Sequence, residues 1–354
     1  MTRIAALLIV LASSWGATAQ ADPEAIRHYG PDDATQHLLV RGTTDIALFD
    51  PVLQLFAQSR PDLGIDYEQW GSNDLYSLAV SACAGMDHAA DLIISSSIDQ
   101  QVKLVNDGCA QSHSSAATAA LPTSSNWRDQ VFGITREPAV IVYNRALVPP
   151  EDAPLSRFAL IDLLRAEDRR YEGKVATYDI EQSGLGYLFA FADSQQATTF
   201  GSVIEAFART HAVTTCCSAE IIDGVASGKY LIAYNILGSY ALARAAKDPN
   251  IVVVAPTDYT LVLSRAALIP TRASNPAAAG DLIDFLLSDE GRQSLSAQYL
   301  YLAPSQMREN GLIGTEDGGS SLRPMPLSPV LLVGLDQQRR AHFIKLWRSA
   351  FSDR

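Results

Sequence analysis

The Ser-Gly-x-Gly-Tyr segment at residues 183–187 has the residue types of an anion-binding turn. It joins an expected apolar strand, 174–178, directly to a helix, with Ser183, Gly184 and Tyr187 at the connection. A helix N-terminus presents unpaired backbone N–H groups and the positive end of the helix dipole, and glycine lets a ligand approach the backbone. The pattern is equally typical of a β-α connection in which Ser183 only caps the helix, so both interpretations stay open.

Further hydroxyl and amide side chains follow other expected strands. Strands at 37–41, 65–70 and 91–95 end in loops rich in such groups. The carboxyl ends of parallel strands meet at one edge of a sheet, where open α/β sheets bind ligands. Neutral donors suit phosphate or carboxylate oxygens because they add no large buried charge that must be desolvated. The candidates are Thr43, Thr44, Ser72, Asn73, Ser95, Ser96 and, from the second half of the chain, Thr215, Ser218 and Asn235.

Two arginines and an aromatic residue complete the predicted site. Arg41 ends a strand and Arg136 lies at a proposed hinge, so each either reaches the ligand or forms a structural ion pair. Trp70, like Tyr187, would wall the carbon skeleton of a ligand, although buried aromatic residues more often belong to the core.

Catalytic and metal-binding patterns are missing from the sequence. Its 6 histidines are scattered without H-E-x-x-H spacing, and there is neither a G-x-S-x-G elbow nor a Walker loop. No base stands at a recognisable spacing from Ser95. We therefore expect a binding protein with no cofactor and no metal, rather than an enzyme.

Charge and the N-terminal segment restrict the compartment and the partners. The formal net charge is −12, which argues against nucleic acid and anionic membranes as partners. Arg3 precedes a short apolar run and small residues, which predicts a signal peptide at 1–21. The first cysteine is Cys83, so no acceptor for a lipid anchor lies near the cleavage site. The sequence predicts a free, monomeric periplasmic protein.

The four cysteines predict disulfide bonding in that oxidising compartment. Cys83 and Cys109 belong to neighbouring β-α units, and we expect a bridge between them. Cys216 and Cys217 are adjacent, and a bond between neighbours requires a strained eight-membered ring. We therefore expect these two as thiols, or with partners that the sequence does not identify.

Alternating strands and helices indicate an α/β fold, and the length indicates two lobes. We expect lobe 1 at 22–136 plus 260–354 and lobe 2 at 137–259, each a mixed sheet flanked by helices. The helix after the 42–45 loop is expected to begin with Asp50 as N-cap and Pro51 in its first turn. The tail at 327–351 predicts amphipathic helices that pack on the first lobe or form a partner surface.

An ordered set of segments resembles the solute-binding proteins of ABC importers with the type II fold. These segments are VRGTTD, PDLGIDYEQW, DLIISSSID, REPAVIVYN, GKVATYD, SGLGYLF, SGKYLIAYN and SNPAAAGDLIDFLLSDEGRQ. They are most similar to the branch with ferric-iron binders, hexose-phosphate binders and the phosphoglycerate-transport regulatory protein. The resemblance implies two lobes that close around a ligand through a two-strand hinge, with crossings near 133–138 and 255–261.

The resemblance also restricts the class of ligand that we expect. Ferric-iron members hold the metal with adjacent tyrosines in the segment that matches residues 230–239, where this chain has Tyr234-Asn235-Ile236-Leu237 with a single tyrosine. Ferric iron prefers several anionic oxygen ligands, so the departure argues against it. We expect a small anionic organic solute, a phosphorylated metabolite before a carboxylate, delivered to an inner-membrane ABC permease. A ligand-sensing subunit for a sensor histidine kinase is the alternative role.

Overall fold

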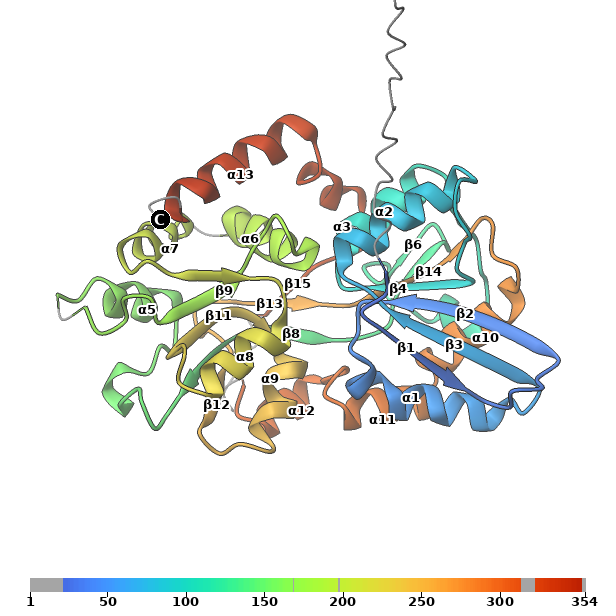
Figure 1. Cartoon of the computed structure of the whole chain (residues 1–354), viewed down its shortest axis with the longest axis horizontal. Helices are drawn as coiled ribbons and strands as arrows, with labels where there is room; N and C mark the ends of the chain where they lie inside the picture. The colour runs from blue at the N-terminus through green and yellow to red at the C-terminus, as the bar shows by residue number, and fades with distance from the viewer. Residues whose placement is uncertain (1–21, 168, 197, 313–321, 352–354) are drawn as a thin grey trace, which may run out of the picture.

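The computed structural model describes residues 22–167, 169–196, 198–312 and 322–351 (Figure 1). The predicted signal peptide lies outside the described residues. Within them, no helix is both long enough and apolar enough to cross a membrane. Two sheets lie side by side, each covered by helices, as the α/β prediction requires.

The first lobe is built on a mixed sheet. Its order is β1 (Ala25–Tyr29), β3 (Leu63–Gln69), β2 (Gln36–Gly42), β4 (Leu92–Ser95), β14 (Ala266–Pro270), β7 (Val131–Gly133) and β6 (Asn126–Trp127), with β5 (Ala110–Gln111) beside β14. The central strands β2, β3 and β4 are parallel, whereas β1 and β14 run antiparallel to their neighbours. All four residues of β4 are buried, as expected of a strand covered on both faces.

Helices of the first lobe flank this sheet. They are α1 (Ile46–Ser59), α2 (Ser72–Cys83), α3 (Ile98–Asn106), α4 (Ala116–Ala119), α10 (Pro276–Leu287) and α11 (Asp289–Ala297). The next helix, α12 (Pro304–Glu309), lies beside the second lobe (Figure 1). The Cys83–Cys109 disulfide joins the end of α2 to the start of β5, as expected.

The first helix begins earlier than predicted. Asp45, not Asp50, is the N-cap of α1, and Pro51 lies inside the helix. The early start is stabilised from outside the helix, because the Ile46 N–H donates to the Gln69 side chain at 2.9 Å. This contact satisfies one of the N–H groups that a first turn leaves unpaired. The loop that carries Thr43 therefore leads straight into a helix N-terminus.

The second lobe has its own mixed sheet. Its order is β10 (Val213–Thr215), β9 (Val175–Tyr178), β11 (Ile232–Leu237), β8 (Glu137–Asn144), β13 (Thr260–Leu263) and β15 (Leu322–Pro324), with β12 (Ile251–Val254) beside β8. Its α-helices are α5 (Arg157–Leu164), α6 (Gly184–Gln196), α7 (Phe200–Arg209), α8 (Ser218–Ala226) and α9 (Gly238–Ala245), and a short 3-10 helix, η1 (Pro150–Asp152), precedes them.

The chain passes from the first sheet to the second, returns to the first, and later reaches the second sheet again with β15. The first crossing lies between β7 and β8, within the predicted 133–138 segment. The return lies between Leu263 and Ala266, later than the expected 255–261, because β13 still pairs with β8 in the second sheet. We therefore place the second boundary between β13 and β14, at residues 264–265.

The C-terminal tail contacts both lobes. The 3-10 helix η3 (Pro329–Val333) packs on α3 of the first lobe, while α13 (Gln337–Phe351) packs on α7 of the second (Figure 1). The Phe343 ring stacks on Phe200 with ring centroids 5.7 Å apart. The expectation that the helices of the tail pack on the first lobe does not hold for α13, because its apolar face covers aromatic residues of α6 and α7.

Candidate functional site

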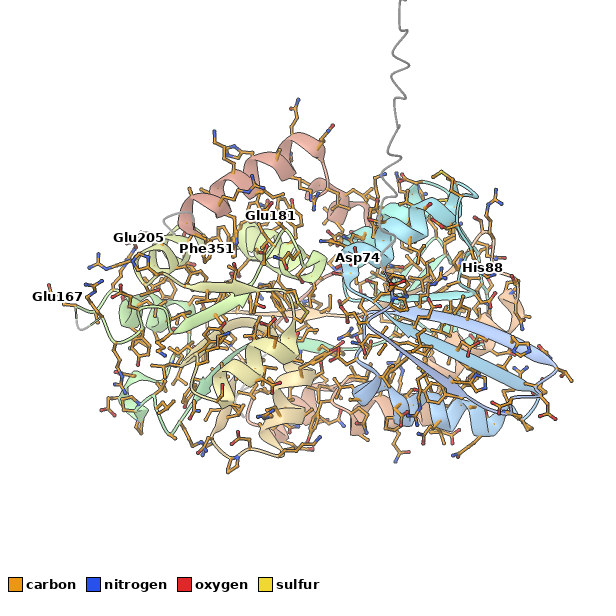
Figure 2. The ribbon with its side chains drawn as sticks, viewed as in Figure 1. Asp74, His88, Glu167, Glu181, Glu205 and Phe351 are labelled. Atoms are coloured by element: carbon orange, nitrogen blue, oxygen red, sulfur yellow. A yellow bond between two sulfur atoms is a disulfide. The ribbon has the colours of Figure 1, made fainter. Side chains whose placement is uncertain are left out.

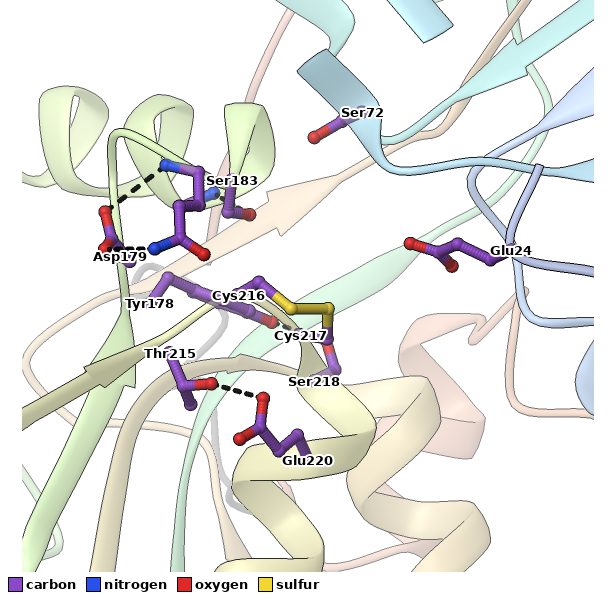
Figure 3. The surroundings of a disulfide bond; sticks show 12 residues. Glu24, Ser72, Tyr178, Asp179, Ser183, Thr215, Cys216, Cys217, Ser218 and Glu220 are labelled. Atoms are coloured by element: carbon purple, nitrogen blue, oxygen red, sulfur yellow. Dashed lines mark hydrogen bonds between the residues drawn. A yellow bond between two sulfur atoms is a disulfide. The ribbon is translucent and has the colours of Figure 1, made fainter. Parts of the chain in front are cut away.

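A cavity of about 490 Å³ lies between the two lobes, and we call it the interlobe cavity. Residues of the first lobe that line it are Glu24, Thr43, Asp45, Gln69, Trp70, Gly71, Ser72, Asn73, Asp74 and Ser96. The second lobe and the crossing contribute Tyr178, Glu181, Gln182, Ser183, Leu185, Cys216, Cys217, Ser218, Ala219, Leu237, Tyr240 and Arg265. Figure 3 shows part of this lining, with Ser72 and Glu24 facing residues of the second lobe.

Five helices begin at the interlobe cavity. Their cap or first residues in its lining are Asp45 for α1, Ser72 for α2, Ser183 for α6, Cys217 for α8 and Leu237 for α9. The first turn of each helix leaves backbone N–H groups unpaired, and the helix dipoles add partial positive charge at the same place. Side chains already accept from the N–H groups of Ile46, Gly184 and Leu237. The cavity therefore offers an anion the remaining N–H groups and the helix dipoles, without a cluster of formal cations.

Hydroxyl groups lie among these helix starts. The Thr43 and Ser96 hydroxyls share a hydrogen bond of 3.1 Å, and the Ser96 N–H donates to Thr43 Oγ1 at 2.9 Å. On the second lobe, the Tyr178 hydroxyl and Ser218 Oγ are 2.6 Å apart. Burial raises the pKa of Tyr178 to about 12, so this hydroxyl keeps its proton at physiological pH. These groups are suited to hydrogen bonding with phosphate or carboxylate oxygens.

Arg265 lies at the crossing between β13 and β14 and is part of the lining of the cavity. It is 1% exposed, and its Nε donates to Glu137 Oε1 at 2.9 Å. Burial by itself would lower the pKa of Arg265, but the charge and hydrogen bond of Glu137, together with Tyr240 and Tyr67, outweigh this effect and hold the pKa above its ordinary value. Its Nη1 donates to the Thr43 carbonyl at 3.2 Å. Arg265 thus stays charged, joins the two lobes, and is largely neutralised by Glu137.

Four carboxylates also line the cavity: Glu24, Asp45, Asp74 and Glu181. Asp74 and Glu181 belong to different lobes (Figure 2). Glu24 accepts a hydrogen bond of 2.9 Å from Gln69 Nε2. The hydrogen bond from Arg348 holds the pKa of Glu181 below its usual range. The lining therefore has a negative side in addition to its helix N-termini.

The two lobes touch at the cavity. Asn73 Nδ2 of the first lobe donates to the Glu181 carbonyl at 3.0 Å and to the Gln182 carbonyl at 2.9 Å. The Gly184 N–H of the second lobe donates to Ser72 Oγ at 2.9 Å. Tyr240 OH donates to Asp45 Oδ1 at 2.8 Å. These hydrogen bonds hold the lobes in a closed arrangement.

Cys216 and Cys217 are bonded to each other, so the expectation of two thiols or distant partners is wrong. The chain turns here from β10 into α8, and Cys217 is the N-cap of α8. This turn brings the two neighbouring side chains together. Both cysteines line the interlobe cavity.

Seven of the predicted residues line the cavity: Thr43, Trp70, Ser72, Asn73, Ser96, Ser183 and Ser218. Ser183 also has the capping role that was its alternative, because Ser183 Oγ accepts from the Gly186 N–H at 3.1 Å. Their contact with a solute stays a prediction.

The other eight predicted residues lie outside the lining: Arg41, Thr44, Ser95, Arg136, Gly184, Tyr187, Thr215 and Asn235. Gly184 still adjoins the cavity through its bond to Ser72. Arg41 has the alternative structural role, because its Nε pairs with Glu68 Oε2 at 2.7 Å. Arg136 bonds through its backbone N–H to the Leu300 carbonyl.

The remaining polar candidates make contacts within the fold. In the first lobe, the Thr44 carbonyl accepts from the Tyr67 hydroxyl, and Ser95 Oγ accepts from the Ser97 N–H. In the second lobe, the Tyr187 hydroxyl donates to the Gly334 carbonyl, the Thr215 hydroxyl to Glu220, and the Asn235 side chain to Asp193. Tyr187 and Asn235 are 2% and 5% exposed and line two other cavities of the protein. In the sequence, these residues lie near strand ends or helix starts, as do the seven that line the cavity. The sequence pattern therefore could not separate the two groups.

Sequence reasoning missed Tyr178, Tyr240, Arg265 and the four lining carboxylates. Tyr178 ends the strand that leads to the Ser183 turn, and Tyr240 lies in the first turn of α9. Their places at a strand end and a helix start were the sequence signal that could have identified these two tyrosines. Arg265 had no such signal, because its position depends on the crossing between β13 and β14.

Comparisons with known proteins agree with this architecture. A family model described as bacterial extracellular solute-binding protein matches residues 87–312. The substrate-binding protein of an ABC transporter from Agrobacterium tumefaciens is 34% identical, with 92% of this chain and 98% of that chain covered and a TM-score of 0.85. A search of curated proteins finds no match to this chain.

More distant structures share the fold alone. AfuA from Actinobacillus pleuropneumoniae, with fructose-6-phosphate bound, is 14% identical over 91% of this chain and 100% of that chain, with a TM-score of 0.68. Iron-bound HitA from Pseudomonas aeruginosa is 16% identical over 89% of this chain and 99% of that chain, with a TM-score of 0.66. Both have the two-lobe architecture that the resemblance implied. This chain belongs to the bacterial extracellular solute-binding proteins and is similar to the substrate-binding components of ABC transporters.

Proposed function

We propose that this protein captures a small anionic organic solute in the periplasm and delivers it to an ABC permease of the inner membrane. The observation that carries the proposal is the meeting of five helix N-termini at one cavity between two lobes. Helix N-termini favour anions through their free N–H groups and their dipoles. The family of the chain supports the transport role, which is binding and release rather than catalysis.

A phosphorylated metabolite fits this cavity better than a simple carboxylate. A phosphate group accepts hydrogen bonds in several directions, and the N-termini and hydroxyls approach from both lobes. The volume of about 490 Å³ lies within the range of roughly 300–1,000 Å³ that is common for small-molecule sites. The size therefore leaves room for a carbon skeleton beside the anionic group.

The carboxylates Glu24 and Asp45 favour, within this class, a solute that also carries an ammonium group. Arg265 is already neutralised by Glu137, so the formal charges that line the cavity are mostly negative. An ammonium group near Glu24 or Asp45 would gain Coulomb attraction and hydrogen bonds. Phosphoethanolamine and ethyl phosphate form a matched pair that tests this point, because they differ in the amine.

Iron fits the described site less well. Among the described residues, no group of three His, Cys, Asp or Glu side chains could hold a metal ion. Tyr234, the tyrosine at the position of the iron-binding pair, is 3% exposed and donates its hydroxyl to Asp193 within the second lobe. A sensing role with a histidine kinase would use the same cavity and the same solute, so it differs only in the partner of the closed form.

A thermal-shift screen of the mature protein tests the proposed function. The panel contains phosphoethanolamine, ethyl phosphate, fructose 6-phosphate, phosphoglycerates, inorganic phosphate, di- and tricarboxylates and ferric citrate. A ligand at about 100 times its Kd adds about 2.7 kcal/mol to the free energy of unfolding, which raises the melting temperature measurably. We expect the largest shift with an organophosphate. A shift with ferric citrate alone, or with no organic anion at all, would contradict the proposal.

A further inference from the structure

The two disulfides of this chain differ in what they constrain. Cys83 and Cys109 are 26 residues apart, so their bond closes a long loop and restricts the unfolded chain. Cys216 and Cys217 are 1 residue apart and close no loop. The entropic stabilisation from a crosslink grows with the length of the closed loop, so the second bond contributes little of this kind. Its role must be sought in its immediate surroundings.

The surroundings of the second bond are the interlobe cavity. Both cysteines belong to its lining and are half-buried. Figure 3 shows the sulfur–sulfur bond at the wall formed by the second lobe, with Glu24 of the first lobe across the cavity. The bond therefore presents two sulfur atoms at the place where a solute is expected.

A disulfide gives this wall a different chemistry from two thiols. Thiols are weak donors that ionise with an ordinary pKa of about 8.5, whereas the bonded pair has no proton to donate and no charge. Sulfur is polarisable and packs well on carbon surfaces. Ala219 and Leu237 add further apolar lining from the same lobe. The wall suits the carbon skeleton of a solute rather than its anionic group.

The bond also fixes the start of α8. Cys217 is the N-cap of α8 in an extended conformation, and the next residue, Ser218, shares a hydrogen bond of 2.6 Å with Tyr178 OH. The Tyr178 hydroxyl also accepts from the Leu237 N–H, at the N-cap of α9, at 3.3 Å. The disulfide thus lies next to Ser218, whose hydrogen bond to Tyr178 connects the start of α8 to the start of α9 at the cavity.

We propose that the Cys216–Cys217 disulfide determines specificity by contacting the carbon skeleton of the bound solute, while the helix N-termini hold its anionic group. This inference rests on the proposed function. It defines the substrate class as organic anions with a carbon skeleton that reaches the second-lobe wall. An inorganic anion fills only the part of the site that the helix N-termini form.

The test compares two variants by calorimetric titration. C216A/C217A removes both sulfur atoms at the cavity, and C83A/C109A removes a disulfide that does not line it. The probes are inorganic phosphate and the organophosphate of the screen that gives the largest shift with the wild-type protein. We expect C216A/C217A to weaken the organophosphate about tenfold, the effect of losing about 50 Å² of buried apolar contact. Binding of inorganic phosphate should stay within about twofold of the wild-type protein.

The control variant separates loss of contact from loss of folding. We expect C83A/C109A to melt at a lower temperature but to bind both probes as the wild-type protein does. Unchanged organophosphate affinity in C216A/C217A would overturn the inference, and so would an equal loss for both probes. A wild-type protein that binds no organic anion would instead overturn the proposed function, an outcome visible before any variant is made.

Discussion

Asn73 closes the cleft by donating to two backbone carbonyls of the opposite lobe, at 3.0 and 2.9 Å. The substitution Asn73→Ala removes both interlobe hydrogen bonds and leaves the backbone of α2 intact. Each such bond contributes about 0.5–1.5 kcal/mol net, so the pair contributes about 1–3 kcal/mol to closure. The bonds lie at an exposed edge, which favours the lower end of this range.

Closure is part of the binding free energy, because the solute is enclosed only when the lobes meet. A loss of about 1–1.4 kcal/mol corresponds to about five- to tenfold weaker binding. Calorimetric titration with the solute identified in the thermal-shift screen measures this change. Small-angle X-ray scattering follows closure itself, as the decrease in the radius of gyration when the solute is added.

A matched control is Asn310→Ala, because Asn310 Nδ2 donates at 2.8 Å to the Gln306 carbonyl within one helix end, away from the cavity. We expect this variant to bind the solute as tightly as the wild-type protein. Unchanged affinity in Asn73→Ala would refute the reasoning that these bonds hold the closed form. An equal loss in both variants would assign the effect to general destabilisation.

Three further predictions concern stability. Removing the Cys83–Cys109 bond should lower the free energy of unfolding by roughly 3.5 kcal/mol, from a closed loop of about 26 residues, and chemical denaturation measures this loss. Burial raises the pKa of Asp99 to about 7, so the folded state holds more protons than the unfolded state between about pH 4 and 7. Stability should fall by at most about 4 kcal/mol as pH rises through this window, and Asp99→Asn should abolish that slope in melting curves from pH 4 to 8. Glu137→Gln leaves Arg265 buried without its partner charge and should cost about 3–5 kcal/mol in urea unfolding; a cost below 1 kcal/mol would show that this pair is not needed in the fold.

Local patterns were sufficient to predict most of the fold. The apolar runs of β2, β4, β9 and β11 and the turn residues between them are visible along the chain, and Pro138, the second residue of β8, lies just after the first crossing. Contacts between segments that are distant in the sequence could not be predicted from local patterns. The pairing of β13 with β8 moved the second crossing, and the aromatic surface that α13 covers is assembled from separate helices.

In the candidate site, too, local features were predictable and long-range contacts were not. Local sequence places Ser72, Asn73 and Ser183 at helix starts, and all three line the cavity. The same kind of pattern also selected Ser95 and Thr215, which lie outside the lining. Arg265 was missed because its contact with Glu137 joins residues 128 positions apart. Arg41 has the pattern of a ligand-binding arginine, but Glu68 on the neighbouring strand pairs with it. Arg265 is paired as well, with Glu137, so its place at the crossing between β13 and β14 is what brings it to the cavity.

A crystal structure of the protein with the solute from the thermal-shift screen tests the central claim most directly. We predict the solute in the interlobe cavity, with its anionic group within about 3.2 Å of backbone N–H groups at the helix N-termini from both lobes. A solute bound outside this cavity, or held there by carboxylates alone with no contact to a helix N-terminus, would contradict the account.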